Sequence, residues 1–320
     1  MTNNPVLEPY KKGFLDVGPD SIGVGTGHKI YYELHGNPKG KPILYVHGGP
    51  GVGFSENAKK WFDLELWNVI LFDQRGAGHS TPFASLEHNT TDDLVSDINK
   101  LLDHIGVQKV TLFGGSWGST LSLVYAIRNT ERVNGMILRG IFLPSKEHNQ
   151  YMFGGGIQKF APKEWERFLS LVPEDKRTDP TQYYAEKMMH GTHEEKEKYA
   201  YEWAYYEVSL MQLKITGKEI GDAMSDGTYR ALSPLEAHYL LNNCFLPENY
   251  ILDNAHTLSK IPTYIIHGKY DRICPPGYAY DLSQKIKGSK LVFTIAGHAS
   301  SDRENKKKLL WALKKIYPFV

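Results

Sequence analysis

The first 140 residues alternate short apolar runs with polar or Gly-rich turns. The segments expected to be strands, because apolar residues dominate them, are 42–46, 68–72, 110–113 and 133–138. Runs of this kind are typical of strands that are buried on both faces. Segment 91–105 has an apolar stripe at helical spacing and acidic residues in its first turn, and 121–128 is also expected to be a helix. This alternation predicts a mostly parallel sheet with helices on both faces.

The pattern changes at both ends of this region. Segment 27–36 alternates polar and apolar residues, which predicts an antiparallel strand at the edge of the sheet. From 144 to 251 the chain is helical in character and rich in aromatic and charged residues. The earlier alternation then resumes with strands at 262–267 and 290–295 and helices at 276–285 and 302–317. We therefore predict a split α/β core, 1–143 and 252–320, with an inserted helical cap, 144–251.

Composition narrows the partners of the protein. The 320 residues carry a formal net charge of +1, so nothing attracts the chain as a whole to nucleic acid or to an anionic membrane. Small substrates of low charge are therefore more natural partners than nucleic acids or membranes. The N-terminus lacks a signal-peptide pattern, and no apolar run approaches the roughly 20 residues that span a bilayer. Cys244 and Cys274 have no metal-site or disulfide-framework spacing, so we expect a cytoplasmic protein without a metal.

The strongest chemical signal lies where the third apolar run ends. The sequence Gly-Gly-Ser-Trp-Gly at 114–118 follows a predicted strand and precedes a predicted helix. A Gly-x-Ser-x-Gly pattern in this position is typical of a nucleophile elbow, a sharp turn that exposes the serine hydroxyl. Gly114 and Gly118 suit the turn because a side chain would collide with the backbone there. Ser116 is therefore the predicted nucleophile.

A serine nucleophile needs a histidine base that is oriented by a carboxylate. In hydrolases built on a sheet, the chain order is serine, acid, histidine, and the last two follow later strands. Asp271 comes just after the strand expected at 262–267, and His298 comes just after the strand expected at 290–295. Both the order and the positions fit, so Asp271 and His298 complete the predicted triad.

Other residues compete for these roles. His267 ends a buried strand and is better explained as a hydrogen-bonded core residue, His104 lies on a helix, and His47 begins a glycine loop. Among the acids, Asp302 is expected to cap or begin the last helix. Asp253 precedes a core strand instead of following one. None of these positions suits a triad as well.

Acyl transfer also requires backbone N–H groups that stabilise the developing oxyanion. The residue after the nucleophile, Trp117, can supply one of them. The second is expected from the glycine loop 47–51 that follows the first apolar run, with Gly49 favoured and Gly48 next. Pro50 has no N–H and can only stiffen this loop.

These segments together resemble the proline iminopeptidases, a family of the α/β-hydrolase superfamily. The matching motifs lie at 47–51, 73–80, 114–119, 138–142, 268–271 and 297–298 and cover nearly the whole core. The resemblance implies an α/β-hydrolase fold with an inserted helical cap and an enzyme that releases N-terminal proline from small peptides or aminoacyl amides. It also implies that Ser116, Asp271 and His298 act without a metal or cofactor.

The resemblance assigns further residues in the cap. Two family patterns that bind the substrate's amino group correspond to 203–207 and 236–240, so Glu207 and Glu236 are the expected amine site. Without the resemblance, each would be interpreted as a solvated surface glutamate. The expected proline pocket consists of Phe142, Tyr151 and Leu240.

Three positions depart from the family patterns. Tyr206 stands where the first pattern has Trp, Ala237 replaces Asn, and Leu240 replaces Phe. These changes affect the pocket and not the reacting residues, so they bear on how strictly proline is preferred.

Two other functions remain open at the level of sequence. The first is a different hydrolase on the same scaffold, such as an esterase or amino-acid amidase. The second is a catalytically silent binding module that retains the fold. Epoxide hydrolases and haloalkane dehalogenases are disfavoured because their nucleophile is an Asp where this chain has Ser116. The oligomeric state is not indicated.

Overall fold

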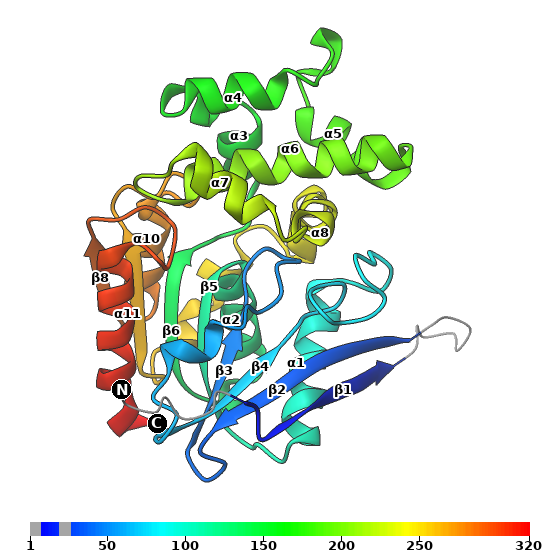
Figure 1. The fold of residues 1–320 in the computed structure, drawn as a ribbon. Coiled ribbons are helices and arrows are strands. Elements are labelled where there is room, and N and C mark those ends of the chain that lie inside the picture. Colours follow the sequence, from blue (N-terminus) through cyan, green and yellow to red (C-terminus); the bar gives the residue numbers. More distant parts are fainter. Residues whose placement is uncertain (1–7, 19–26) are drawn as a thin grey trace.

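The computed structural model describes residues 8–18 and 27–320. Within these residues the chain forms one eight-stranded sheet with the strand order β1-β2-β4-β3-β5-β6-β7-β8 (Figure 1). The strands are β1 (Lys11–Gly18), β2 (His28–Gly36), β3 (Lys41–Val46), β4 (Trp67–Phe72), β5 (Val110–Ser116), β6 (Val133–Ile141), β7 (Thr263–Gly268) and β8 (Lys290–Thr294).

The direction of the strands confirms the predicted sheet, with one correction. All pairs from β4 through β3 to β8 are parallel, whereas β1–β2 and β2–β4 are antiparallel. The prediction that 27–36 lies at the edge was wrong, because β2 pairs on both sides and β1 is the edge strand. Strand β1 has no clear strand pattern in the sequence, and one of its few apolar residues, Phe14, is 54% exposed. An edge strand with one solvated face needs little apolar content.

Helices cover both faces of the sheet, as predicted. They are α1 (Thr91–His104), α2 (Trp117–Arg128), α10 (Pro276–Lys285) and α11 (Arg303–Ile316). Neighbouring strand residues point to opposite faces: Leu44 belongs to the apolar layer under α1, α2 and α10, and Ile43 to the layer under α11. Both layers are closed to solvent, which explains why the strand sequences are almost continuously apolar.

A group of helices separates β6 from β7 in the sequence, and we call it the cap helices. They are α3 (Lys146–Phe153), α4 (Pro162–Leu169), α5 (Pro180–His190), α6 (His193–Met211), α7 (Gly217–Met224) and α8 (Tyr229–Leu241). The short helix α9 (Tyr250–Asn254) follows them before β7. Figure 1 shows α3 to α8 above the sheet. They lie at the carboxyl ends of the parallel strands, since Tyr239 on α8 packs against Trp117, the residue after β5.

Aromatic side chains hold the cap helices together. Phe168 on α4 and Tyr184 on α5 stack with ring centroids 4.4 Å apart, and Phe153 on α3 stacks on Trp203 of α6 at 4.5 Å. Helix α6 begins with a capping box between Thr192 and Glu195. This anchored aromatic cluster fixes the position of α6, whose last turns contribute to the site described below.

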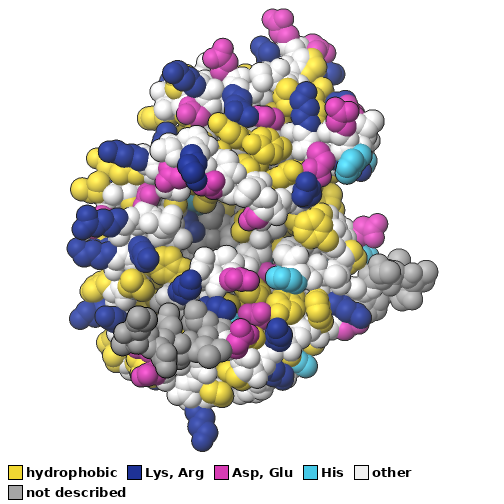
Figure 2. Space-filling model, in the orientation of Figure 1, with side chains coloured by type: hydrophobic (Ala, Val, Ile, Leu, Met, Phe, Trp, Pro, Cys, Tyr) yellow, Lys and Arg dark blue, Asp and Glu magenta, His cyan; other side chains and the backbone are white. Residues whose placement is uncertain are grey.

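The surface carries charges of both signs in close alternation, in keeping with the formal net charge of +1. The face in Figure 2 is hollowed between the cap helices and the core. In the described parts of the chain, 8–18 and 27–320, no helix is both long enough and apolar enough to cross a bilayer.

Candidate active site

The turn between β5 and α2 has the geometry of a nucleophile elbow. Ser116 ends the strand with φ 58° and ψ −130°, a strained conformation for a residue with a side chain, and α2 begins at Trp117. A Cβ atom added to Gly114 would collide with the carbonyl oxygen of Gly118, and one added to Gly118 would collide with that of Val46. The two glycines are therefore required by the close approach of strand, helix and neighbouring loop.

The structure brings Asp271 and His298 into direct contact. His298 Nδ1 lies 2.8 Å from Asp271 Oδ2, and both side chains are buried in the loops after β7 and β8. The backbone N–H groups of Ile273 and Cys274 donate to Asp271 Oδ1 at 3.0 and 2.8 Å. Although burial opposes ionisation of Asp271, the charge and hydrogen bond of His298 lower its pKa below the ordinary value. An ionised Asp271 holds the proton of His298 on Nδ1.

The other ring nitrogen of His298, Nε2, does not contact Asp271. Nε2 is buried and has no hydrogen-bond partner among the described residues. Strand β6 connects this ring to the elbow: Ser116 pairs with Ile141, and Gly140 packs so tightly on the ring that an added Cβ would lie 2.8 Å from His298 Cε1. Arg139 also donates from Nη1 to the carbonyl oxygen of His298 at 2.8 Å. Adjacent positions of one strand thus contact both the elbow and the histidine.

The competing histidines have structural partners. His267 is buried and accepts a hydrogen bond from the Ile141 N–H at Nδ1 (3.0 Å), so its Nε2 carries the proton and donates to the Cys274 carbonyl at 2.9 Å. The same Nε2 lies 3.4 Å from Asp271 Oδ2, which gives this core residue a position beside the acid. His104 is exposed and contacts the Tyr32 hydroxyl at 2.9 Å.

The competing acids lie elsewhere. Asp302 occupies the position before α11, but its side chain makes no capping hydrogen bond. It accepts instead from the N–H groups of Gly297 at 2.6 Å and Leu213 at 3.1 Å, and so joins the His298 loop to the chain after α6. Asp302 therefore stands at the start of α11, as expected, but its side chain does not cap the helix. Asp253 lies on α9 ahead of β7, as the sequence indicated.

The glycine loop after β3 lies directly against the elbow. A Cβ added to Gly48 would lie 3.2 Å from the Gly115 carbonyl oxygen and 3.4 Å from Ser116 Cβ. Gly49 has φ +105°, in the region that favours glycine. Within the described residues, the N–H groups of Gly48 and Gly49 donate to no other backbone carbonyl. Both groups therefore remain available to a ligand beside Ser116.

Glu207 and Glu236 form a pair inside the cap helices. Glu207 lies on α6 and is only 8% exposed, and Glu236 lies half-buried on α8. Their carboxyl groups hydrogen-bond to each other, and Trp203 Nε1 donates to Glu236 Oε2 at 2.7 Å. Glu207 and Glu236 are therefore not the solvated surface glutamates that their helical positions alone would predict. Salt bridges among the described residues involve neither of them.

The electrostatics of this pair follow from its burial. Burial raises the pKa of both carboxyl groups, and the charge of Glu207 raises the pKa of Glu236 further. Two carboxylates in contact cannot both ionise readily in a buried site, so the pair retains a proton above the pKa of an ordinary glutamate. The end of α6 contacts the loop that carries His298, because the Ala299 N–H donates to the carbonyl oxygen of Met211 at 2.8 Å, one turn after Glu207 on the same helix. The pair therefore lies near His298, whose charge lowers the pKa of Glu207.

Helix α8 connects the glutamate pair to the rest of the site. It carries Glu236, and its Tyr239 packs edge-on against the Trp117 indole with centroids 4.7 Å apart. Near its start, Leu232 contacts the glycine loop: a Cβ added to Gly51 would lie 2.8 Å from Leu232 Cα. One rigid helix thus sets the distance between the pair, the elbow and the glycine loop.

The three residues of the predicted proline pocket come from different parts of the chain: Phe142 follows β6, Tyr151 lies on α3 and Leu240 lies on α8. Phe142 and Leu240 are buried. Tyr151 donates its hydroxyl to the Arg272 carbonyl at 2.8 Å and lines a cavity of about 460 Å³ beside Asp271. Neither Phe142 nor Leu240 lines that cavity. The structure therefore does not gather the three side chains in one described cavity.

One buried residue near the triad had no signal in the sequence. His148 on α3 packs against Phe142 with ring centroids 4.8 Å apart, and its buried Nδ1 has no partner in the described structure. Burial lowers its pKa to about 3, so the ring is neutral and can only offer hydrogen bonds. Only the fold could reveal this residue, because it is a single polar residue on a short helix.

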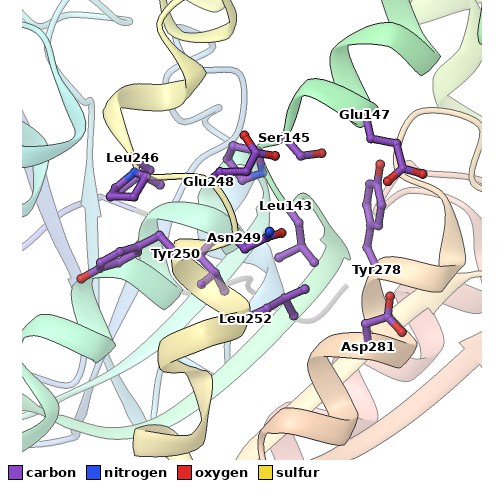
Figure 3. A pocket seen from close by; sticks show the side chains of 13 residues that line it. Leu143, Ser145, Glu147, Leu246, Glu248, Asn249, Tyr250, Leu252, Tyr278 and Asp281 are labelled. Atoms are coloured by element: carbon purple, nitrogen blue, oxygen red, sulfur yellow. The ribbon is translucent and has the colours of Figure 1, made fainter.

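A second cavity, of about 230 Å³, lies where the chain enters and leaves the cap helices (Figure 3). Its walls include Leu143 and Ser145 after β6, and Leu246 and Asn249 before α9. None of the residues predicted to react or to bind substrate lines it.

Comparisons with known proteins agree with this geometry. The family model described as "alpha/beta hydrolase fold" matches residues 41–304. A probable proline iminopeptidase of Leptolyngbya boryana is 38% identical over 297 residues, 92% of this chain and 90% of that protein. Proline iminopeptidases of Arabidopsis thaliana and Neisseria gonorrhoeae are each 36% identical, over 97% and 98% of this chain and 80% and 98% of theirs.

Solved structures of lower identity share the fold. A bromoperoxidase from Bacillus anthracis aligns with a TM-score of 0.66 at 20% identity, over 95% of this chain and all of its own. An esterase from Exiguobacterium antarcticum aligns with a TM-score of 0.64 at 20% identity, over 91% and 96% of the two chains. Proteins with different reactions thus share this scaffold, and the reaction must be argued from the site.

Proposed function

Because the chain belongs to the proline iminopeptidase family of α/β hydrolases, we propose that it is a serine aminopeptidase that releases N-terminal proline from peptides. The observation that carries the proposal is the buried glutamate pair beside the Asp271–His298 contact. A hydrolase that acts on uncharged esters has no use for two buried carboxyl groups without a cation. An aminopeptidase needs them to bind the charged N-terminus.

In the proposed reaction, His298 Nε2 removes the proton of the Ser116 hydroxyl while the serine oxygen attacks the carbonyl carbon of the first residue. His298 then gives this proton to the leaving nitrogen, and the bond to the second residue breaks. Water hydrolyses the acyl-enzyme with His298 again as the base. Asp271 keeps the proton of the ring on Nδ1 and stabilises the imidazolium during both steps.

We assign the oxyanion hole to the backbone N–H of Trp117 and to that of Gly49 or Gly48. Trp117 follows the nucleophile at the start of α2, and Gly48 packs against Ser116. Preorganised N–H groups of this kind stabilise the charge that develops on the carbonyl oxygen in the transition state.

The glutamate pair is the proposed amine site. Holding one proton, Glu207 and Glu236 together carry a single negative charge, which matches the single positive charge of an N-terminal ammonium group. Through α8 this charge stands at a fixed distance from Ser116 and the glycine loop. Such a spacing supports cleavage after one residue, on small peptides or aminoacyl amides with a free N-terminus.

The proposed cap is a single insertion into the core. We divide the chain into a core, 1–143 and 252–320, and a cap, 144–251, because the cap helices form one continuous insertion between β6 and β7.

Phe142 and Leu240, both buried and apolar, are the proposed contacts of the proline ring. Tyr151 contributes to the wall of the cavity near Asp271.

The experiment that tests this function compares a prolyl arylamide with its N-acetylated form. Acetylation removes the positive charge and adds bulk at the amine, so an aminopeptidase rejects the acetylated substrate. An esterase or amidase without an amine site accepts both substrates.

The shared proton also makes a prediction about stability. The folded pKa of the pair is raised above the unfolded value, so the native state keeps a proton that the unfolded chain releases as the pH rises above about 4.5. The free energy of unfolding of the wild type therefore falls as the pH rises from 5 to 7. A variant whose amine site binds no extra proton in the native state does not show this fall. We expect Glu236→Gln to unfold at a higher temperature at pH 7, with an advantage that grows by about 1.4 kcal/mol per pH unit while one proton is held.

Thermal and denaturant unfolding from pH 4.5 to 7.5 measure this difference. The matched control is Glu194→Gln, an exposed glutamate on the same helix as Glu207, for which the difference from wild type should not change with pH. A pH-independent difference for Glu236→Gln would show that the pair holds no proton at neutral pH.

A further inference from the structure

The loop after β4 places one buried amide side chain between the glycine loop and the elbow. Gln74 is 1% exposed and uses both ends of its amide. Its Nε2 donates to the His47 carbonyl oxygen at 2.9 Å, and its Oε1 accepts from Trp117 Nε1 at 2.9 Å. Its backbone N–H donates to His47 Nε2 at 3.0 Å. All three bonds are buried, and none of them was indicated by the sequence.

The bond to the His47 carbonyl fixes the direction of the next N–H. The peptide between His47 and Gly48 is trans, so its C=O and N–H point in opposite directions. Because Gln74 Nε2 holds the carbonyl oxygen of this peptide on one side, the Gly48 N–H is fixed on the other. Without that bond, a peptide between His and two glycines could rotate at little cost.

The bond to the His47 ring fixes the following peptide in the same way. A backbone N–H can only donate, so His47 Nε2 is the acceptor for Gln74 and the ring proton lies on Nδ1. That Nδ1 donates to the Gly48 carbonyl oxygen at 2.8 Å. The peptide between Gly48 and Gly49 is also trans, so the Gly49 N–H is directed away from His47. Burial lowers the pKa of His47, which favours this neutral ring.

The third hydrogen bond of Gln74 joins it to Trp117 at the elbow. Trp117 is fully buried and carries the backbone N–H assigned to the other half of the oxyanion hole. Its indole is held between Gln74 Oε1 and the ring of Tyr239. Gln74 therefore contacts, directly or through His47, the two peptides of the glycine loop that carry assigned oxyanion N–H groups, and it contacts the side chain of Trp117, whose backbone N–H is the third.

We propose that Gln74 is a positioning residue that preorganises the oxyanion hole, with His47 as its intermediary on the glycine loop and Trp117 on the elbow. It touches neither substrate nor the reacting atoms. The inference rests on the proposed serine-hydrolase function but not on the preference for proline. A residue with this role stabilises the transition state and leaves binding of the ground state unaffected.

The test uses Gln74→Met, which keeps the volume and removes both amide bonds, and Gln74→Glu, which keeps an acceptor for Trp117 but cannot donate to His47 while ionised. With a prolyl arylamide we expect kcat to fall 10- to 100-fold in both variants and KM to change less than threefold. The inhibition constant of the boronic acid analogue of proline, which forms a tetrahedral adduct with Ser116, should rise by the same factor as kcat falls. That of pyrrolidine, which has no carbonyl group, should stay within twofold.

Two further variants keep the test decisive. Tyr125→Phe removes another side-chain hydrogen bond, to Asn99 Oδ1 at 2.8 Å, and should lower the stability without lowering kcat. If the Gln74 variants do not fold, Trp117→Phe removes the indole bond to Gln74 together with part of the packing on Tyr239, and it should show the same pattern with a smaller fall in kcat. A kcat within twofold of wild type, or a pyrrolidine affinity that falls as far as that of the boronic acid, would overturn the proposal.

The rate at which a fluorophosphonate labels Ser116 separates this inference from the proposed substrate. The phosphoryl oxygen of the probe requires the same N–H groups, whereas the probe has no N-terminal proline. If the wild type labels rapidly but leaves the prolyl arylamide intact, the proposed aminopeptidase fails while the Gln74 variants still report on the oxyanion hole. Labelling at wild-type rate in Gln74→Met would contradict the positioning role in either case.

Discussion

Replacing Ser116 by alanine is expected to lower kcat/KM for a prolyl arylamide by about 10⁴- to 10⁶-fold. The substitution removes the oxygen that forms the acyl-enzyme, and the remaining oxyanion N–H groups and binding sites cannot replace that step. The backbone of the elbow is held by Gly114 and Gly118, whose contacts do not involve the serine hydroxyl, so the variant should fold and melt close to the wild type. Steady-state kinetics and a thermal melt measure the two effects.

A serine on α10 provides the control for this substitution. Ser283→Ala removes a hydroxyl that donates to the carbonyl oxygen of Tyr280, away from the triad, and should keep activity within twofold. Fluorophosphonate labelling should disappear in Ser116→Ala and persist in Ser283→Ala. Turnover of Ser116→Ala within tenfold of wild type would mean that another residue is the nucleophile.

Removing both carboxyl groups from the proposed amine site, and with them its single negative charge, is expected to have the next largest effect. In the double variant Glu207→Gln/Glu236→Gln the substrate ammonium loses its only carboxylate partners in a buried site, which costs about 2–5 kcal/mol. We expect kcat/KM for the prolyl arylamide to fall about 10²- to 10³-fold. The single variants should lose less, because one glutamate then ionises and restores the single negative charge.

Labelling by the fluorophosphonate shows whether the triad remains intact in the double variant. The labelling rate should stay within threefold of wild type, since the probe carries no amine. Glu194→Gln, an exposed residue on α6, is the matched control and should keep full aminopeptidase activity. If the double variant cleaves the prolyl arylamide at the wild-type rate, the amine binds somewhere else.

The sequence indicated where the candidate triad residues lie, because parallel sheets constrain such positions strongly. Strands buried on both faces are recognisable from their apolar content, and the loops at their carboxyl ends must meet at one edge of the sheet. Asp271 and His298 could therefore be identified by position alone, and the structure joins them at 2.8 Å. The glycines of the elbow are visible in the sequence for a similar reason, since no other residue fits.

The features that the sequence missed depend on contacts between distant segments. Gln74 is an ordinary polar residue until β4 places it between His47 and Trp117. His148 contacts Phe142, the residue that follows β6, only because the fold brings α3 against that position. Helical pattern could not show that Glu207 and Glu236 are buried together, and only the resemblance to a family singled them out.

The edge of the sheet and the arrangement of the pocket residues were harder to predict from the sequence, for a different reason. Strand β1 has a solvated face and few apolar residues, so the alternating segment behind it was taken for the edge. The pocket residues Phe142, Tyr151 and Leu240 lie directly after β6, on α3 and on α8, and their relative position depends on how the cap helices pack. That packing rests on aromatic contacts such as Phe153 on Trp203, which local sequence patterns do not encode.

The ratio of kcat/KM for a prolyl arylamide to that for the same compound acetylated on its nitrogen shows whether the enzyme recognises a free N-terminus. The buried pair of Glu207 and Glu236 predicts a ratio of at least about 10² for the wild type, because only the free amine carries the charge that the pair can bind. It also predicts that the ratio falls towards unity in Glu207→Gln/Glu236→Gln. Equal cleavage of the two compounds by the wild type would contradict the account.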